Sequence, residues 1–427
     1  MNDLDDEVLV TEFIRSLKFE NDVTALKEFL LPTDILSNIV TQTDSDKWVE
    51  KSHLENIVYW FFSTFMDGNL ESLQIKMVSE KSKKEVSRTL TDNAVISPNA
   101  LGERLGNDKV VEGLGKIFEY TVARSKTKVF DNSLGLKPVF YDWMYITKSG
   151  EAWQICNEMP RGDNFHGFKI GVGNDWNSKS IVSLVFHGQE HPNDNISFQR
   201  ELWIDDAPGI INIPDRGPFD TKHLGQISKE GQYFIIRLKK NLRVIPVHLK
   251  KHSNEDFVKL SIASKPKIKL LQSGFIRLLA NPELGDLKFV KFQYNNEKSG
   301  RFETIELISD LPLDTIDIIE LSAQRWRATE TEFNILQHSF GFEKLLVRDP
   351  TKVWPLFLIA VICKSLFQRV LEAIHSVHGG SIDMSTFKSN LGTIIEHIGN
   401  GRAGPLPLDP CDAVLCPYRR KHGVRWR

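Results

Sequence analysis

Residues 210 to 220 read Ile210-Ile211-Asn212-Ile213-Pro214-Asp215-Arg216-Gly217-Pro218-Phe219-Asp220. The β-branched start predicts a short buried strand, and the residues after Asp220 have the apolar spacing of a short helix. Asp215 follows the strand directly, and Gly217 allows the chain to turn sharply towards the helix. Ligands and ions bind at strand ends in open α/β sheets, so Asp215 is a candidate metal ligand, with a turn former or helix cap as the alternative.

Segments rich in β-branched and aromatic residues lie on both sides of this stretch and predict further strands. They cover residues 139–141, 168–172, 181–186 and 233–239. The sequence then stays β-rich until about Ile308, and helical periodicity returns over residues 318–340 and 353–374. This alternation predicts a mixed α/β domain over residues 129–400, with a β-rich insertion at about 240–312.

The first part of the chain, residues 1–128, has apolar residues at helical spacing and predicts a helical N-terminal domain. Ser97-Pro98 is typical of a helix start, and Gly106-Asn107 interrupts the helical pattern that follows. Two short helices around a glycine turn fit either a DNA-reading helix-turn-helix or an ordinary helical hairpin. Residues 401–427 form a basic C-terminal tail.

The composition limits the classes of function. The 427 residues contain 54 Lys and Arg against 56 Asp and Glu, so any contact with a polyanion must come from a local basic patch. Four cysteines are too few and too scattered for a disulfide framework. The acidic start is unlike a secretory signal, and no apolar run is long enough for a membrane span. We therefore expect a cytoplasmic protein without membrane contact.

Two further acids accompany Asp215. Asp142 directly follows the predicted strand 139–141, so it occupies a similar strand-end place. Glu330 lies on the predicted helix 318–340 and shares a helical face with Gln337, seven residues later. Arg325, Trp326 and Arg327 precede Glu330 by about one turn, and Glu332 follows it.

The order of these residues resembles the DDE transposases of bacterial and archaeal insertion sequences, in particular insertion-sequence family four. The resemblance covers roughly residues 137–365. The matching positions, in chain order, are Asp142, His166-Gly167-Phe168-Lys169-Ile170, Asp215-Arg216-Gly217 with Phe219, Phe234 leading to Arg237-Leu238-Lys239, Arg325-Trp326, Glu330 with Phe333, and Gly341-Phe342-Glu343-Lys344-Leu345.

The resemblance implies a ribonuclease H-like sheet in which Asp142, Asp215 and Glu330 are catalytic and bind two Mg²⁺ ions, with Mn²⁺ as a substitute. It further implies cleavage at terminal inverted repeats, joining to target DNA, and a homodimer that acts at the nucleoid. The N-terminal domain would then bind DNA ends or dimerise. The candidate DNA-binding residues are Arg237, Lys239, Arg325, Trp326, Arg327 and Gln337.

Several positions differ from the family pattern. Trp143-Met144 stands where a small residue and threonine usually follow the first aspartate, which leaves Asp131 and Asp175 as alternatives to Asp142. Pro218 replaces a tyrosine, Arg325 is one residue too far from the glutamate, and Gln337 replaces a lysine. Glu332 fits the pattern less well than Glu330. These departures support an alternative function, a DNA-binding protein derived from a transposase with impaired catalysis. A metal-dependent nuclease or phosphatase of another kind is a third hypothesis.

Overall fold

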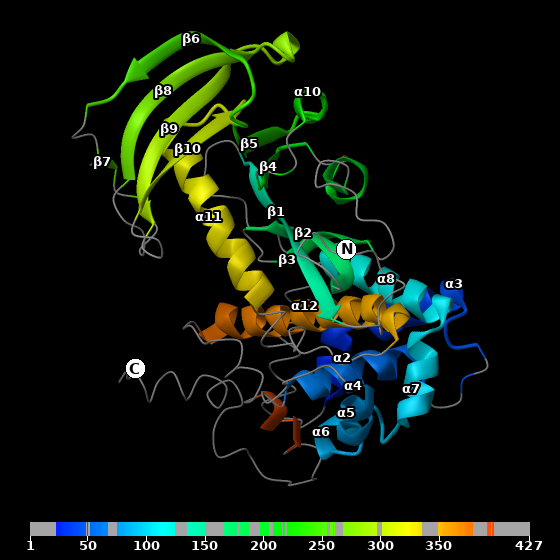
Figure 1. Ribbon diagram of the computed structural model, residues 1–427. Coiled ribbons are helices and arrows are strands. Elements are labelled where there is room, and N and C mark those ends of the chain that lie inside the picture. Colours follow the sequence, from blue (N-terminus) through cyan, green and yellow to red (C-terminus); the bar gives the residue numbers. More distant parts are fainter. Residues whose placement is uncertain are drawn as a thin grey trace. The chain divides into compact units, whose positions relative to one another are not determined.

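The computed structural model describes residues within 23–123, 135–334, 349–378 and 391–396, apart from 67–74, 150–164, 188–196, 261–267 and several gaps of one to four residues. Contacts divide the chain into two compact units, shown in Figure 1. One unit is Lys126–Phe333, and the other combines Met1–Ser125 with Asn334–Arg427.

The Lys126–Phe333 unit is built on a mixed sheet of ten strands (Figure 1). Its strand order is β3-β2-β1-β4-β5-β10-β9-β8-β6, and β7 pairs with β8. β4 runs parallel to both of its neighbours, β1 and β5. Every other pairing among the described strands is antiparallel. The strands are β1 (Lys137–Ser149), β2 (Phe165–Asp175), β3 (Ser180–His187), β4 (Ile210–Pro214), β5 (Tyr233–Arg237), β6 (Val244–Lys251), β7 (Phe257–Val258), β8 (Ile268–Leu278), β9 (Leu287–Asn296) and β10 (Arg301–Ser309).

The sheet carries an apolar core on each of its faces. Leu224 and Ile227 of α10 (Thr221–Lys229) belong to one core, and Ile318 and Leu321 of α11 (Thr315–Asn334) belong to the other. Every residue of β4 is buried. A strand covered on both faces needs a continuous apolar run, which explains the unbroken apolar character of the β4 sequence.

The mixed α/β fold with helices that was expected from the sequence is confirmed, but β1 and β2 are longer than predicted. Asp142 therefore lies inside β1 and does not end it, which corrects the strand-end expectation. β1 continues past Asp142 because it pairs with β2 as far as Ser149, whereas its other neighbour β4 stops at Pro214. Asp142 is thus level with the end of β4 while remaining within a strand.

Strands β6 to β10 lie between β5 and α11 in the sequence and extend the same sheet. β10 joins them to the parallel strands through the antiparallel pair Leu307 and Arg237. Gly274 on β8 has a φ of +147°, and a Cβ there would lie 1.9 Å from the His248 carbonyl oxygen. Only glycine allows β6 and β8 to approach this closely.

The other unit is helical, as expected for the N-terminal region. Its helices are α2 (Thr24–Leu30), α3 (Thr33–Thr43), α4 (Leu54–Met66), α5 (Ile75–Lys81), α6 (Glu85–Leu90), α7 (Pro98–Leu105), α8 (Asp108–Ala123) and α12 (Val353–His378). α4 is buried continuously from Ile57 to Met66. α12, far away in the sequence, packs against α8 and α4, and Phe367 stacks on Phe62 with ring centroids 4.0 Å apart.

The predicted helix start at Ser97-Pro98 is confirmed, because the Ser97 hydroxyl accepts a hydrogen bond from the Ala100 amide at 3.2 Å.

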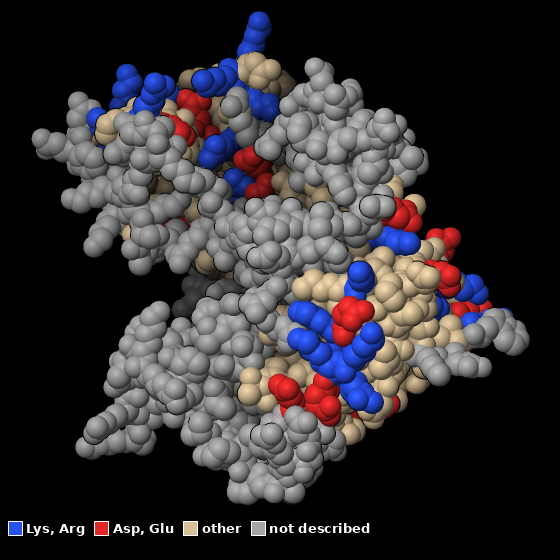
Figure 2. Space-filling model, turned by 60° about the horizontal axis from the view of Figure 1, so that its bottom comes forward, with Lys and Arg blue, Asp and Glu red and all other residues tan. Residues whose placement is uncertain are grey.

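Figure 2 brings the underside of Figure 1 forward and shows Lys and Arg side chains close to acidic ones. The exposed basic residues from α5 to α6 are Lys76, Lys83, Lys84 and Arg88. In the described part of the chain, no helix combines the length and apolar character that crossing a membrane requires.

Asp310 links three elements of the sheet unit. At the end of β10, its carboxylate accepts hydrogen bonds from the Phe234 amide of β5 at 2.9 Å and from the Ser228 hydroxyl of α10. Burial raises the pKa of Asp310 to about 6, although both hydrogen bonds act in the opposite direction. The folded protein therefore binds this proton more tightly than the unfolded chain.

We predict that Asp310 makes the protein less stable as the pH rises from about 4 to 6, by up to about 3 kcal/mol. The sign follows from the raised pKa, since the stabilising proton is present below the unfolded pKa and is lost as the pH passes the folded pKa. Asp310→Asn should remove this dependence, because an amide stays neutral. Denaturant unfolding at pH 4.5 and 7.5 measures the effect, and an equal pH dependence in both proteins contradicts it.

Candidate active site

The register of the parallel strands brings Asp142 and Asp215 together. Tyr141 of β1 pairs with Pro214 of β4, so the next residues along the two strands, Asp142 and Asp215, lie level with each other. Neighbouring strands are about 4.8 Å apart, and residues at one level of a parallel pair point to the same face. Two carboxylates this close would repel each other by roughly 3 kcal/mol at an effective dielectric near 20.

Arg325 of α11 joins these two aspartates. Its Nη1 lies 3.3 Å from Asp142 Oδ2, and its Nη2 lies 3.2 Å from Asp215 Oδ1. The two ends of one guanidinium group therefore contact carboxylates from two strands. The Arg325 side chain is only 10% exposed, whereas those of Asp142 and Asp215 are 25% and 47% exposed. Both acids are therefore more exposed to solvent than the cation that pairs with them.

The local backbone also orients Asp142. Its Oδ1 accepts a hydrogen bond from the Trp143 amide at 2.8 Å, while Oδ2 contacts Arg325. Both oxygens are thus held in position. Asp215 follows β4 just before the turn towards α10, whose first amides are capped by Asp220. Asp220 takes the helix-cap role that was the alternative interpretation for Asp215.

The donor atoms fit a divalent metal ion. Two carboxylates with partly exposed oxygens supply hard ligands, and Mg²⁺ usually combines one or two carboxylates with water molecules. In the described part of the chain, no three His, Cys, Asp or Glu side chains are grouped closely enough to hold a metal. The side chain of the expected third acid, Glu330, lies outside the described residues, although its backbone continues α11.

Two glutamates on α11 compete for the third position. Glu330 is five residues after Arg325, which places it about 140° around the helix from Arg325. Glu332 is seven residues after Arg325 and shares its helical face within about 20°. The family pattern favours Glu330, whereas the helix geometry favours Glu332.

A comparison with models of protein families identifies the family of the chain. The family described as "Transposase DDE domain" matches residues 139–366, more than half of the chain. The chain belongs to this family. Members of the DDE transposase family cleave and join DNA and generally use divalent metal ions, and this chain is thus a DNA transposase by family.

One solved structure similar to the chain is described as "Cryo-EM structure of piggyBac transposase synaptic complex with hairpin DNA". The identity is 12%, the TM-score is 0.48, and the alignment covers 92% of this chain and 84% of that chain. No curated protein matches the chain.

The structure places some of the predicted DNA-binding residues of this DDE transposase. Asn212 pairs with Phe234, and three residues further along both strands Asp215 is level with Arg237, the last residue of β5. Arg237 is half-buried, as is Lys239 two residues later. The side chains of Trp326 and Arg327 on α11, and Gln337 as a whole, lie outside the described residues.

Of the two alternatives to Asp142, only Asp175 is described. Asp175 is buried, with 2% of its surface exposed, and pairs with Val139 three residues before Asp142 on β1. It is therefore displaced along the sheet from the pair bound by Arg325. Asp131 lies outside the described residues. Of the two described candidates, Asp142 is the one that lies level with Asp215.

Trp143, which departs from the family pattern, points to the face of the sheet opposite Asp142, because successive strand residues alternate. Its indole Nε1 donates a hydrogen bond to the Ser197 hydroxyl at 3.2 Å, and this hydroxyl also contacts His187 Nε2 at 2.8 Å. Gly171 pairs with Trp143 on β2, and a Cβ there would lie 2.9 Å from Trp143 Nε1. Sequence analysis missed this adaptation, because the pairing with Gly171 becomes visible only in the sheet.

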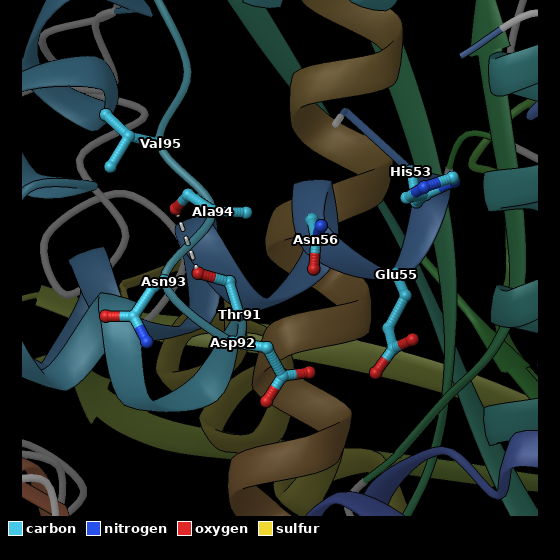
Figure 3. A pocket seen from close by; sticks show the side chains of 8 residues that line it. All are labelled: His53, Glu55, Asn56, Thr91, Asp92, Asn93, Ala94 and Val95. Carbon is cyan, nitrogen blue, oxygen red and sulfur yellow. Dashed lines mark hydrogen bonds between the residues drawn. The ribbon is translucent and has the colours of Figure 1, made fainter. Parts of the chain in front are cut away.

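A separate pocket of about 570 Å³ lies in the helical unit (Figure 3). It is lined by His53, Glu55, Asn56, Thr91, Asp92, Asn93, Ala94 and Val95. Lys27 pairs with Glu55 at 3.1 Å and with Asp92 at 3.2 Å. Burial lowers the pKa of Lys27, but the two acids outweigh this effect and raise it overall. Glu55 and Asp92 thus have a structural partner in Lys27.

We predict that Gly171→Ala destabilises the protein by about 1–3 kcal/mol, because its Cβ would meet Val185 Cγ1 at 2.7 Å as well as the Trp143 indole. Gly115→Ala is the matched control, since no atom lies within 4 Å of a Cβ at that helical position. It should be neutral or stabilise the protein by up to about 1 kcal/mol. Thermal unfolding of both variants measures this, and equal melting temperatures contradict the role of Gly171.

Proposed function

We propose that this DDE transposase, of the insertion-sequence family four type, cuts DNA at the inverted repeats of its own element and joins the ends to target DNA. The observation that carries the proposal is the side-by-side placement of Asp142 and Asp215, both contacted by Arg325 from α11. The same helix carries the candidate third acid. A pair of solvent-facing carboxylates beside a helix with a further glutamate supports a site for metal-assisted phosphoryl transfer.

Two bound Mg²⁺ ions, or Mn²⁺ in their place, would activate the attacking oxygen and stabilise the leaving oxygen of the phosphodiester. Asp142 and Asp215 would hold these ions from neighbouring strands, and Glu330 would complete the site from α11. Because Asp142 lies on β1 and Asp215 directly follows the neighbouring strand β4, their spacing is set by a rigid scaffold. Arg237, level with Asp215, would contact a phosphate of the bound strand.

The distribution of charge supports DNA binding by the sheet unit. Residues 239–309 contain 14 Lys and Arg against 7 Asp and Glu, although the chain as a whole has a net charge of −2. This part of the chain thus provides the local basic region that a nearly neutral protein needs to bind a polyanion. The exposed bases of α5 and α6 add positive charge on the helical unit. We further propose a homodimer that holds two DNA ends at the nucleoid.

We predict that Asp142→Asn and Asp215→Asn abolish Mg²⁺-dependent cleavage of the element's terminal repeats, because an amide binds a divalent cation far less well than a carboxylate. Glu330→Gln should also abolish cleavage. If the Glu330→Gln protein cuts normally and the Glu332→Gln protein is inactive, the third position belongs to Glu332. Asp286→Asn, which removes an acid that pairs with Arg277 on the sheet surface, is the control and should cut normally. Normal cutting by Asp215→Asn rejects the proposed site.

An alternative function is a DNA-binding protein derived from a transposase with impaired catalysis. It is favoured by Trp143, Pro218 and Gln337, which replace residues of the family pattern. Binding to repeat ends without any cleavage, in the presence of Mg²⁺ or Mn²⁺, would establish it. Cleavage without strand joining would instead favour another metal-dependent nuclease.

We predict that Arg237→Gln weakens DNA binding by a similar factor for all sequences, because a phosphate contact carries no sequence information. The plot of log Kd against log salt concentration should lose about one unit of slope. Fluorescence anisotropy with labelled duplexes at several salt concentrations measures this, with Asp286→Asn as a control for general surface changes. An unchanged slope would remove Arg237 from the DNA interface.

A further inference from the structure

We propose that Arg325 acts as a built-in counter-ion, which occupies the metal site of the DNA-free protein and couples the binding of metal to the binding of DNA. The proposal rests on the proposed function, because it takes Asp142 and Asp215 as the metal ligands. It makes Arg325 a positioning residue, which pairs with the two aspartates in the free protein and with a DNA phosphate in the complex with DNA and metal.

The first step of the argument is that Arg325 and a metal ion compete for the same oxygens. The guanidinium lies 3.3 Å from Asp142 Oδ2 and 3.2 Å from Asp215 Oδ1, and thus spans the space between the carboxylates. A divalent ion bridging the two acids would bind oxygens at about 2.1 Å. The two cations cannot both bridge the pair, so metal entry requires Arg325 to release at least one carboxylate.

The second step concerns the displaced guanidinium. The Arg325 side chain is 10% exposed and carries a positive charge. A nearly buried cation that loses its carboxylate partners needs another anion close by. The anion that arrives during the proposed reaction is a DNA phosphate, and arginine binds phosphate in a two-pronged geometry similar to that for carboxylate.

The consequence is reciprocal coupling between the two ligands. DNA that attracts Arg325 frees the aspartates and raises metal affinity, and metal that displaces Arg325 raises DNA affinity by the same factor. Without DNA, Arg325 compensates part of the negative charge of the two acids and keeps the metal affinity low. The ions would then bind mainly when DNA is present, which limits cutting to the assembled complex.

The first test measures Mn²⁺ binding to the full chain without DNA, by the electron paramagnetic resonance signal of free Mn²⁺. Arg325→Gln should bind Mn²⁺ roughly tenfold more tightly than the unmodified protein, because two ion pairs no longer need to be broken. Arg325→Lys, which keeps the charge but loses the two-pronged geometry, should fall between them. Arg277→Gln removes another Arg–Asp pair of the same unit and should bind Mn²⁺ as the unmodified protein does.

The second test repeats the titration with a short DNA duplex, after subtraction of the Mn²⁺ that the duplex binds alone. The unmodified protein should bind Mn²⁺ several-fold more tightly with DNA than without it, and Arg325→Gln should lose most of this gain. If Arg325→Gln fails to fold, as judged by circular dichroism, Arg325→Lys takes its place in this comparison and should lose part of the gain. Equal or weaker Mn²⁺ binding by a folded Arg325→Gln protein, or no gain with DNA, overturns the proposal.

Asp215→Asn separates this inference from the proposed function. If Mn²⁺ binding to the unmodified protein is unaffected by Asp215→Asn, the metal site itself is wrongly assigned, and both proposals fail. If binding depends on Asp215 but responds neither to Arg325→Gln nor to DNA, the metal site stands and only the role of Arg325 is rejected.

Discussion

The candidate site depends on the repulsion between two carboxylates that parallel strands force to the same level. Asp142 and Asp215 cannot separate without breaking the register between β1 and β4, so their charges must be balanced by a nearby cation. In the folded chain this cation is Arg325, which α11 holds in contact with both acids. The position of α11 is therefore tied to the strand register by charge as well as by the apolar contacts of Ile318 and Leu321.

The same sheet supports this arrangement from its other face. Trp143, next to Asp142 on β1, is directed away from the acids, where Ser197 satisfies its indole and Gly171 leaves room for it. A bulky residue can thus replace the small residue of the family pattern, because alternation along the strand keeps it out of the acidic face. The presence of Trp143 is therefore sterically compatible with the position of Asp142 on β1.

The two compact units do not correspond to continuous halves of the chain. α12 follows the sheet unit in sequence yet packs among the N-terminal helices, where Phe367 meets Phe62. Its continuous apolar sequence indicated a core helix but not which core it would join, because apolar side chains carry no information about their partner. The family match at residues 139–366 includes the first part of this helix, so the matched domain extends over parts of both units.

Much of the fold was predictable from local patterns. The apolar run before Asp215, the helix start at Ser97 and the return of helical periodicity after Leu313 each depend on neighbouring residues alone, and all three match the structure. The extent of β1 was missed, since it depends on pairing with β2. For the candidate site, the order of Asp142, Asp215 and Glu330 along the chain resembles that of the DDE transposases. This resemblance indicated the chemistry.

The sequence by itself determined which residue types were available, where short strands and helices form, and that any DNA contact must come from local positive charge. Only the tertiary structure decided that Asp142 and Asp215 lie level, that Arg325 bridges them, and that Asp175 lies elsewhere along the sheet. The physical reason is that strand register and ion pairing join residues more than a hundred positions apart, such as Asp215 and Arg325. No local periodicity records such a contact.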